Sequence, residues 1–312
     1  MEILSLITIL GPTATGKTRF AALLAKKINA EIISADSRQV YRGMDIGTGK
    51  DLNDYIIDGE QINYHIIDVA HPNEEYSVFR FKTDFLQVVR KIIVQGKIPI
   101  LCGGTGLYLD AILKDYFFVE VPENPELREE LNKLPVENLS EMLKSMKKVH
   151  NKTDLEDKNR LIRAIEIQKY YETIDTTKNQ IIIKQSVIFG MHFPREIIRN
   201  RIEQRLKNRI DSGMIEEIKK LMADGVSAER LKSFGLEYKF VTLYVEGHLS
   251  KEEMQQKLTT AIQRFSKRQM TWFRRMEKQG IKINWINGEL SDEEKVNYAL
   301  KIINTFSFEE RK

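Results

Sequence analysis

Residues 11–18 read Gly-Pro-Thr-Ala-Thr-Gly-Lys-Thr and match G-x-x-x-x-G-K-[ST], the pattern of a phosphate-binding loop. The run before them, residues 3–10, is rich in apolar and β-branched side chains, which predicts a buried parallel strand. After them, apolar residues recur at helical spacing over residues 18–28. A strand, a glycine loop and a helix N-terminus in this order place several backbone N–H groups around one anion. The predicted diphosphate-binding residues are Gly11, Pro12, Thr13, Ala14, Thr15, Gly16, Lys17 and Thr18.

Two side chains of this loop have chemistry of their own. Lys17 can neutralise a phosphate oxygen, and the hydroxyl of Thr18 can hold Mg²⁺. The loop by itself does not indicate which diphosphate it binds.

Acidic side chains end two further strand candidates. Residues 31–36 form a short apolar run that ends in Asp36, and ligands of parallel α/β sheets bind beyond the carboxyl ends of strands. Asp36 is therefore expected near the loop, either as a helix cap or Mg²⁺ partner, or as a general base. Residues 64–69 end near Asp68, which is either a metal-binding acid or an ordinary loop carboxylate.

A third strand end converges on the same rim. Residues 97–102 are apolar and are followed by Gly-Gly-Thr-Gly at 103–106. Glycines allow a backbone to approach a ligand closely, and Thr105 offers a hydroxyl at that point.

Composition limits the class of protein. The chain has 312 residues, of which 42% are hydrophobic and 30% charged, as in a globular protein. A single cysteine, Cys102, excludes an internal disulfide framework and suits a reducing cytoplasm. Glu2 stands where a signal peptide would have basic residues, and no stretch reaches the roughly 18 apolar residues of a membrane span. The net charge of +4 is mild, so a nucleic-acid role must rest on local clustering.

The order of the elements predicts the architecture. Strand–loop–helix units fill residues 1–119, and a β-rich segment at 181–192 returns to the sheet. Between them, residues 120–184 show helical patterns only, after prolines at 122 and 125. We therefore expect an α/β fold of the P-loop NTPase type, a parallel sheet flanked by helices. Its core comprises 1–119 and 185–312, and 120–184 form a helical insertion domain.

Two basic helices are predicted in the second half. In the first, beginning at residue 194, Arg201 and Arg205 lie beside each other, which suits phosphate capture or a solvated basic face. In the second, residues 261–275, basic and aromatic side chains alternate. That pattern suits RNA, or an ordinary amphipathic helix with a wet basic face.

Several of these motifs together resemble the tRNA dimethylallyltransferase (tRNA isopentenyltransferase) family. The residues that carry the resemblance are 11–18, 34–48 (Ser-Ala-Asp-Ser-Arg-Gln-Val-Tyr-Arg-Gly-Met-Asp-Ile-Gly-Thr), 103–108, Arg160 with 163–166, and 267–274 (Lys-Arg-Gln-Met-Thr-Trp-Phe-Arg). They stand in the family's order along most of the chain, and 34–48 and 267–274 are far more specific than a phosphate loop.

The resemblance implies transfer of a dimethylallyl group from dimethylallyl diphosphate to N6 of adenosine 37 in tRNA. It implies Asp36 as general base, with Lys17, Arg205 and Mg²⁺ on Thr18 stabilising the diphosphate, and Thr105 contacting the adenosine. It implies that the helical insertion clamps the anticodon stem-loop. The predicted fold gives no need for a partner chain, so we expect a monomer. The implied tRNA contacts are Asp36, Ser37, Arg38, Gln39, Thr105, Arg128, Asn159, Arg160, Leu161, Ile162, Arg163, Lys232, Gly235, Lys267, Arg268, Gln269, Thr271, Trp272 and Arg274.

The chain departs from the family pattern in places. Gly49 stands where the family often has alanine, and residues 235–238 read Gly-Leu-Glu-Tyr instead of Gly-Tyr-(Lys/Arg)-Glu. Residues 155–159 lack the usual His-Pro-Asn-Asp. An adenylate isopentenyltransferase, a P-loop small-molecule kinase and a non-catalytic RNA-binding protein remain alternatives, which activity on free AMP or insensitivity to replacement of Asp36 would distinguish.

Overall fold

The computed structural model describes residues 2–114, 121–146, 157–173 and 181–305. The chain forms two compact units. Residues 117–180 make up the smaller one, and residues 2–116 with 181–312 make up the larger one. Residues 181–184 lay both in the predicted insertion, 120–184, and in the strand predicted at 181–192, and the structure places them in that strand, within the larger unit.

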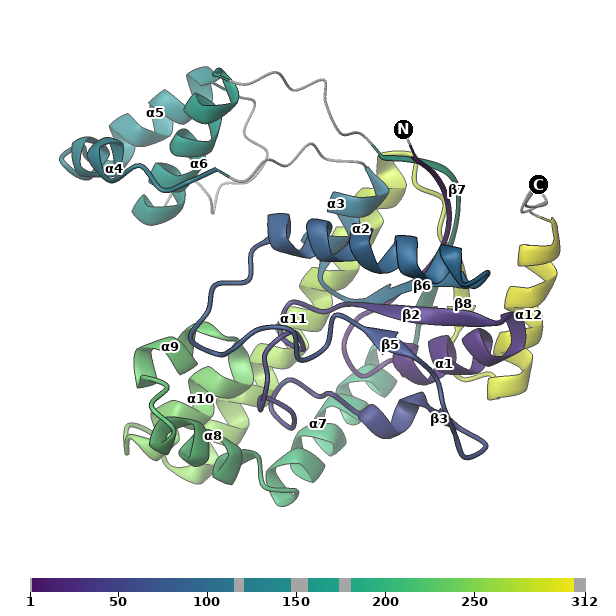
Figure 1. Ribbon diagram of the computed structural model, residues 1–312. Helices are drawn as coiled ribbons and strands as arrows, with labels where there is room; N and C mark the ends of the chain where they lie inside the picture. The colour runs from purple at the N-terminus through teal and green to yellow at the C-terminus, as the bar shows by residue number, and fades with distance from the viewer. Residues whose placement is uncertain (1, 115–120, 147–156, 174–180, 306–312) are drawn as a thin grey trace. The chain divides into compact units, whose positions relative to one another are not determined.

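A six-stranded sheet with the order β5-β2-β6-β1-β7-β8 is the centre of the larger unit (Figure 1). Every pairing between neighbouring strands is parallel, as expected for this fold class. The strands are β1 (Glu2–Leu10), β2 (Ala30–Ala35), β5 (Tyr64–His65), β6 (Ile98–Gly103), β7 (Ile181–His192) and β8 (Asn284–Asn287), and a separate hairpin pairs β3 (Ile56–Ile57) with β4 (Glu60–Gln61).

Helices cover both faces of this sheet, because its buried strands alternate apolar side chains toward each face. Leu6 and Leu10 of β1 belong to the cluster under α2 (Val78–Val94) and α3 (Gly106–Leu113). Ile7 and Ile9 belong to the cluster under α1 (Lys17–Ile28) and α12 (Asp292–Thr305), on the opposite face (Figure 1). The remaining elements of the larger unit are η1 (Leu52–Tyr55), α7 (Arg195–Asp211), α8 (Met214–Ala223), α9 (Ala228–Ser233), α10 (Leu236–Val245) and α11 (Lys251–Lys278).

One predicted strand is much shorter than its sequence suggested. Residues 64–69 were expected to form a strand, but only Tyr64 and His65 do. Ile66 and Asp68 have φ values of 61° and 57°, a left-handed conformation that no strand can contain. Asp68 therefore lies in a turn, and not at the end of a strand.

The smaller unit is helical and has a core of its own. Its helices are α4 (Pro125–Asn132), α5 (Val136–Met146) and α6 (Lys158–Tyr171). Leu139 and Leu143 of α5 pack with Leu161 and Ile165 of α6. Among the residues described in either unit, no helix is long and apolar enough to cross a membrane.

Candidate active site

Three strands end at one edge of the sheet, and this register creates the rim of the site. Leu10 of β1 and Ala35 of β2 both pair with Gly103 of β6. The phosphate loop, Asp36 and the 104–106 loop therefore leave the sheet side by side. A Cβ on Gly103 would lie 2.2 Å from the carbonyl oxygen of Ala35, so only glycine allows this close approach.

A pocket of about 520 Å³ opens above this rim, which is ample for a small ligand. It is lined from elements far apart in sequence, entirely within the larger unit. Residues predicted as catalytic or diphosphate-binding that line it are Thr13, Lys17, Thr18, Asp36, Thr105 and Arg205.

The phosphate loop keeps the start of α1 available to an anion. Gly16 caps the helix in a left-handed conformation, φ 73°, and no side chain caps the helix N-terminus. The hydroxyl of Thr15 donates instead to the carbonyl of Pro12 at 2.8 Å and so fixes the turn of the loop. Gly11, Pro12, Ala14, Thr15 and Gly16 thus shape the loop, while Thr13, Lys17 and Thr18 reach the pocket.

Lys17 is a half-buried cation that lines the pocket. Burial lowers its pKa, and neighbouring Cys102 and Asp36 act in the opposite direction. Its amine makes no hydrogen bond or ion pair with any described residue. Burial likewise raises the pKa of the Cys102 thiol to about 12, so Cys102 is a neutral wall of the pocket and not a nucleophile.

Asp36 and Thr105 lie at adjacent strand ends. The hydroxyl of Thr105 accepts a hydrogen bond from the backbone N–H of Ser37 at 3.0 Å, and the Thr105 N–H donates to Ala35. One carboxylate oxygen of Asp36 accepts from the N–H of Arg38 at 3.0 Å. Its other oxygen has no hydrogen-bond partner among the described residues, so it can accept a proton from a ligand in the pocket.

Gln269 of α11 joins two of the rim loops. Its amide oxygen accepts from the N–H of Thr13 at 2.9 Å, and its amide nitrogen donates to the carbonyl of Gly104 at 2.9 Å. The side chain is buried and both ends of its amide are occupied by backbone. Gln269, which the family resemblance placed among the tRNA contacts, therefore holds the loops together.

Arginines of α7 line the opposite side of the loop. Arg205 donates to the hydroxyl of Thr13 at 3.2 Å and pairs with Asp51 at 2.5 Å. Arg201 donates to the carbonyl of Ala14 at 2.7 Å. Both guanidiniums reach the phosphate loop, so the basic face of this helix is more than a solvated surface.

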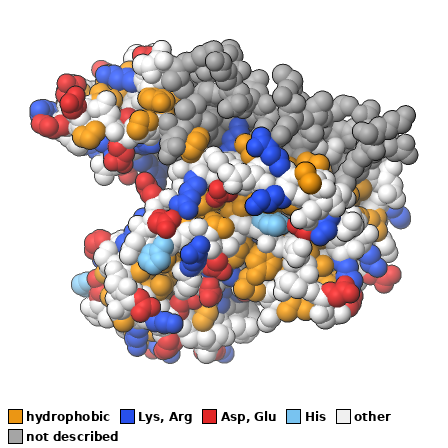
Figure 2. Space-filling view, viewed as in Figure 1, with side chains coloured by type: hydrophobic (Ala, Val, Ile, Leu, Met, Phe, Trp, Pro, Cys, Tyr) orange, Lys and Arg blue, Asp and Glu red, His pale blue; other side chains and the backbone are white. Residues whose placement is uncertain are grey.

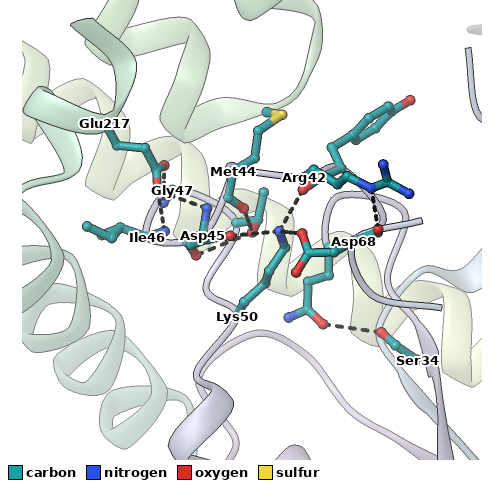
Figure 3. Close-up of polar contacts among 12 residues, drawn as sticks. Ser34, Arg42, Met44, Asp45, Ile46, Gly47, Lys50, Asp68 and Glu217 are labelled. Carbon is teal, nitrogen blue, oxygen red and sulfur yellow. Dashed lines mark hydrogen bonds and ion pairs between the residues drawn. The ribbon is translucent and has the colours of Figure 1, made fainter. Parts of the chain in front are cut away.

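The segment between Asp36 and Lys50 is held by buried polar contacts (Figure 3). The fully buried amine of Lys50 donates to the carbonyl of Tyr41 at 2.6 Å and pairs with Asp45 at 2.8 Å and with Asp68. Asp68 does not line the pocket. Its Oδ1 atom pairs with Lys50 instead.

Glu217 of α8 holds the other side of the same segment. Its two carboxylate oxygens accept from the backbone N–H groups of Asp45, Ile46 and Gly47 at 2.7–3.0 Å (Figure 3). The hydroxyl of Tyr238 donates to it as well, at 2.7 Å. Sequence reasoning missed Lys50 and Glu217, because neither belongs to a motif that contacts ligand.

The other predicted tRNA contacts in the larger unit divide into two groups. Ser37, Arg38, Gln39, Gly235, Arg268 and Trp272 line the pocket. Lys267, Thr271 and Arg274 are exposed on α11 away from it, and Lys232 pairs with Glu229 and Glu246. On the face in Figure 2, basic and acidic side chains are interspersed among the described residues, so positive charge is not concentrated there.

In the smaller unit the predicted contacts include packing residues. Leu161 and Ile162 are buried in its core, so their side chains stabilise the unit and do not face a ligand. Arg128 makes a two-pronged ion pair with buried Glu166, at 3.0 and 2.9 Å. Arg163 also contacts Glu166, while Asn159 and Arg160 are exposed on α6.

Sequence and structure comparisons relate this chain to known proteins. A family model described as IPP transferase matches residues 39–276, and one described as isopentenyl transferase matches residues 4–68. A tRNA dimethylallyltransferase 1 of Parabacteroides distasonis is 52% identical over 304 residues, 97% of this chain and 99% of that protein.

The chain belongs to the tRNA dimethylallyltransferase family.

Solved structures agree with this membership. A tRNA isopentenylpyrophosphate transferase from Bacillus halodurans superposes with a TM-score of 0.69 at 30% identity, over 96% of both chains. A eukaryotic dimethylallyltransferase acting on tRNA gives a TM-score of 0.79 at 21% identity, over 99% of this chain and 81% of that one. The second likeness concerns the fold alone. The predicted α/β class and the predicted family are both confirmed.

Proposed function

We propose that this chain transfers the dimethylallyl group of dimethylallyl diphosphate to N6 of adenosine 37 in tRNA, with Asp36 as general base. The observation that carries the proposal is one pocket that holds a phosphate loop, a carboxylate with a free oxygen and basic side chains together. Family membership supports the reaction class.

In the proposed reaction, the N6 lone pair forms a bond to C1 of the dimethylallyl group as the C1–oxygen bond breaks. Pyrophosphate leaves with that electron pair. The amine of adenine is a poor nucleophile because its lone pair is delocalised into the ring, and transfer of the N6 proton to Asp36 leaves a neutral product. Thr105, beside Asp36, is positioned to hydrogen-bond the base.

Charge on the leaving pyrophosphate would be met by the N-terminus of α1, Lys17 and Arg205. The hydroxyl of Thr18 lines the pocket and makes no hydrogen bond to a described residue, so it fits a Mg²⁺ ligand. When bound, the ion would add positive charge beside the diphosphate. The described residues hold no cluster of three His, Cys, Asp or Glu side chains, which fits a metal that takes most of its ligands from phosphate and water.

For the RNA, we propose that Arg268, Trp272 and Arg38 receive the flipped adenosine and its neighbours at the pocket mouth. The exposed cations Lys267 and Arg274 on α11 would contact the backbone. The smaller unit is proposed to clamp the anticodon stem-loop through exposed residues of α6 such as Asn159 and Arg160. We propose that the chain acts as a monomer, because the fold gives no need for a partner chain.

The test is an assay with labelled dimethylallyl diphosphate and Mg²⁺, offering either an anticodon stem-loop with adenosine 37 or free AMP. We expect label on the stem-loop alone. Label on AMP would indicate an adenylate isopentenyltransferase, and label on neither would lead to a test of kinase activity with ATP.

Replacing the proposed base tests the mechanism. Asp36→Ala should lower the single-turnover rate by roughly 10²-fold or more, because general-base catalysis contributes on that scale. Stem-loop affinity should stay close to that of the wild type. A near-normal rate would remove the assignment of Asp36 as base.

A further inference from the structure

Arg209 is a buried cation at the pocket that the roles described so far leave unexplained. It lies one turn after Arg205 on α7 and lines the same pocket. Its side chain is only 11% exposed. Burial, and then the neighbouring Arg205, lower its pKa to about 10, so it is charged at neutral pH.

The donors of Arg209 are mostly unsatisfied. Its Nε and Nη2 atoms are buried and have no hydrogen-bond partner within the described parts of the chain. Only Nη1 has a partner, the carboxylate of Glu237 at 3.5 Å, a long contact. An isolated buried charge is costly, and buried polar groups normally have partners. Two adjacent guanidiniums, of which Arg209 has free donors, favour an anion beside them.

Gly49 makes room for this side chain. A Cβ on residue 49 would lie 1.5 Å from Nη2 of Arg209 and 2.6 Å from Nη2 of Arg205. Gly49 also has a φ of +66°, and its carbonyl accepts from Gln39 at 3.0 Å. Any other residue at this position would displace the two guanidiniums from where they lie now.

We propose that Arg209 is a second anion-binding guanidinium of this pocket and binds the diphosphate of the prenyl donor together with Arg205. The inference rests on the proposed function. Arg205 touches Thr13 of the phosphate loop, so an anion bound on that loop lies within reach of the pair. A small, deeply bound diphosphate suits a side chain this buried better than an RNA backbone phosphate, which stays outside.

The proposed contact between Arg209 and the diphosphate would also stabilise the leaving group. A diphosphate gains charge as the C1–oxygen bond breaks, and an arginine fork can bind two of its oxygens at once. Arg209 would thus stabilise pyrophosphate more than the intact donor. Arg205 shares its charge with Asp51, whereas Arg209 has only the distant Glu237 carboxylate.

The experiment measures binding of Mg²⁺-pyrophosphate to the full chain by titration calorimetry. Arg209→Met should raise the dissociation constant roughly 10- to 100-fold, the range of a lost charge-assisted hydrogen-bond pair. Arg209→Lys should lie between Arg209→Met and the wild type, because lysine keeps the charge without the fork. The matched control is Lys207→Met, a cation of the same helix that is exposed and outside the pocket lining, which should change the constant less than about 2-fold.

Melting temperatures separate binding from structure. Arg209→Met should melt at or above the wild-type temperature, because it removes a buried charge with unsatisfied donors. A marked fall in melting temperature with unchanged pyrophosphate affinity would make Arg209 a structural partner of Glu237 and overturn the proposal. Gly49→Ala should weaken pyrophosphate binding in the wild type and much less in the Arg209→Met background.

Three further outcomes of these measurements bear on the role of Arg209. Unchanged pyrophosphate affinity with weaker stem-loop binding in Arg209→Met overturns the proposal in favour of an RNA phosphate. A wild-type chain that binds no pyrophosphate overturns it as well. If Arg209→Met weakens pyrophosphate binding while the wild type prenylates no stem-loop, the anion site stands and the proposed function fails.

Discussion

Buried cations serve two different purposes in this molecule. Lys50 is the last residue of the 36–50 segment, and one backbone carbonyl and two carboxylates surround its amine. Lys17 and Arg209, at the pocket, are largely withdrawn from solvent, yet within the described residues Lys17 has no direct partner and Arg209 only a distant one. A buried charge whose partners lie within the protein stabilises the fold. A buried charge without them is held ready for a ligand, at a cost to the unliganded protein.

The largest effect on activity should come from replacing Lys17, the pocket lysine without a direct partner among the described residues. Lys17→Met should lower the single-turnover rate roughly 10²- to 10³-fold, the loss seen when one donor to developing charge is removed. Its melting temperature should not fall, because the variant no longer buries a charge. A large fall in melting temperature with retained activity would instead group Lys17 with Lys50.

Replacing Lys50, whose amine has partners within the protein, should lower the free energy of unfolding. Lys50→Met should lower the free energy of unfolding by about 2 kcal/mol, less than for a fully buried pair because Asp45 and Asp68 are partly exposed and can hydrate. Urea unfolding at neutral pH measures this. The rate at saturating substrates should fall less than in Lys17→Met, and the opposite ranking would break the comparison.

A third, smaller effect on stability should come from Glu31, a carboxylate with hydrogen-bond partners within the protein. Glu31 begins the same strand that Asp36 follows. Burial alone would raise its pKa, but hydrogen bonds from Asn63, Lys97 and His65 outweigh it and lower the pKa from 4.5 to about 2. Between these values the unfolded chain binds more protons, so the stability that Glu31 contributes is complete above pH 4.5 and is lost as the pH falls toward 2.

Glu31→Gln should therefore lower the free energy of unfolding by about 1 kcal/mol at pH 6, and by less at pH 3. Urea unfolding of the variant and the wild type at the two pH values gives the difference. A deficit that does not shrink at pH 3 would show that Glu31 acts through packing and not through its charge.

Local patterns predicted much of the fold. Strand Ile181–His192 was expected with these bounds, because the segment is rich in β-branched residues. The strand expected at 64–69 was wrong beyond His65, since left-handed turns at Ile66 and Asp68 have no clear sequence signal. Strand β8 was missed because it has only four residues, paired at the sheet edge.

The residues of the site also fall into those that the sequence predicted and those that only the structure revealed. Motif residues such as Lys17, Asp36 and Thr105 were named from sequence, and the structure brings them to one pocket. Their individual roles stay predictions. Arg209 lies in the predicted basic helix but was not singled out, because no spacing rule distinguishes a buried arginine from a solvated one on the same helix.

The sequence by itself determined the phosphate loop, the acid after the second strand, the α/β class and the family. These are local features, which side-chain periodicity and short motifs indicate. Only the tertiary structure decided which cations are satisfied. Gln269 bridges to Thr13 across 256 positions, and Arg209 fills the space left by Gly49. Burial and the partners of a charge depend on contacts between distant segments, and no local pattern contains them.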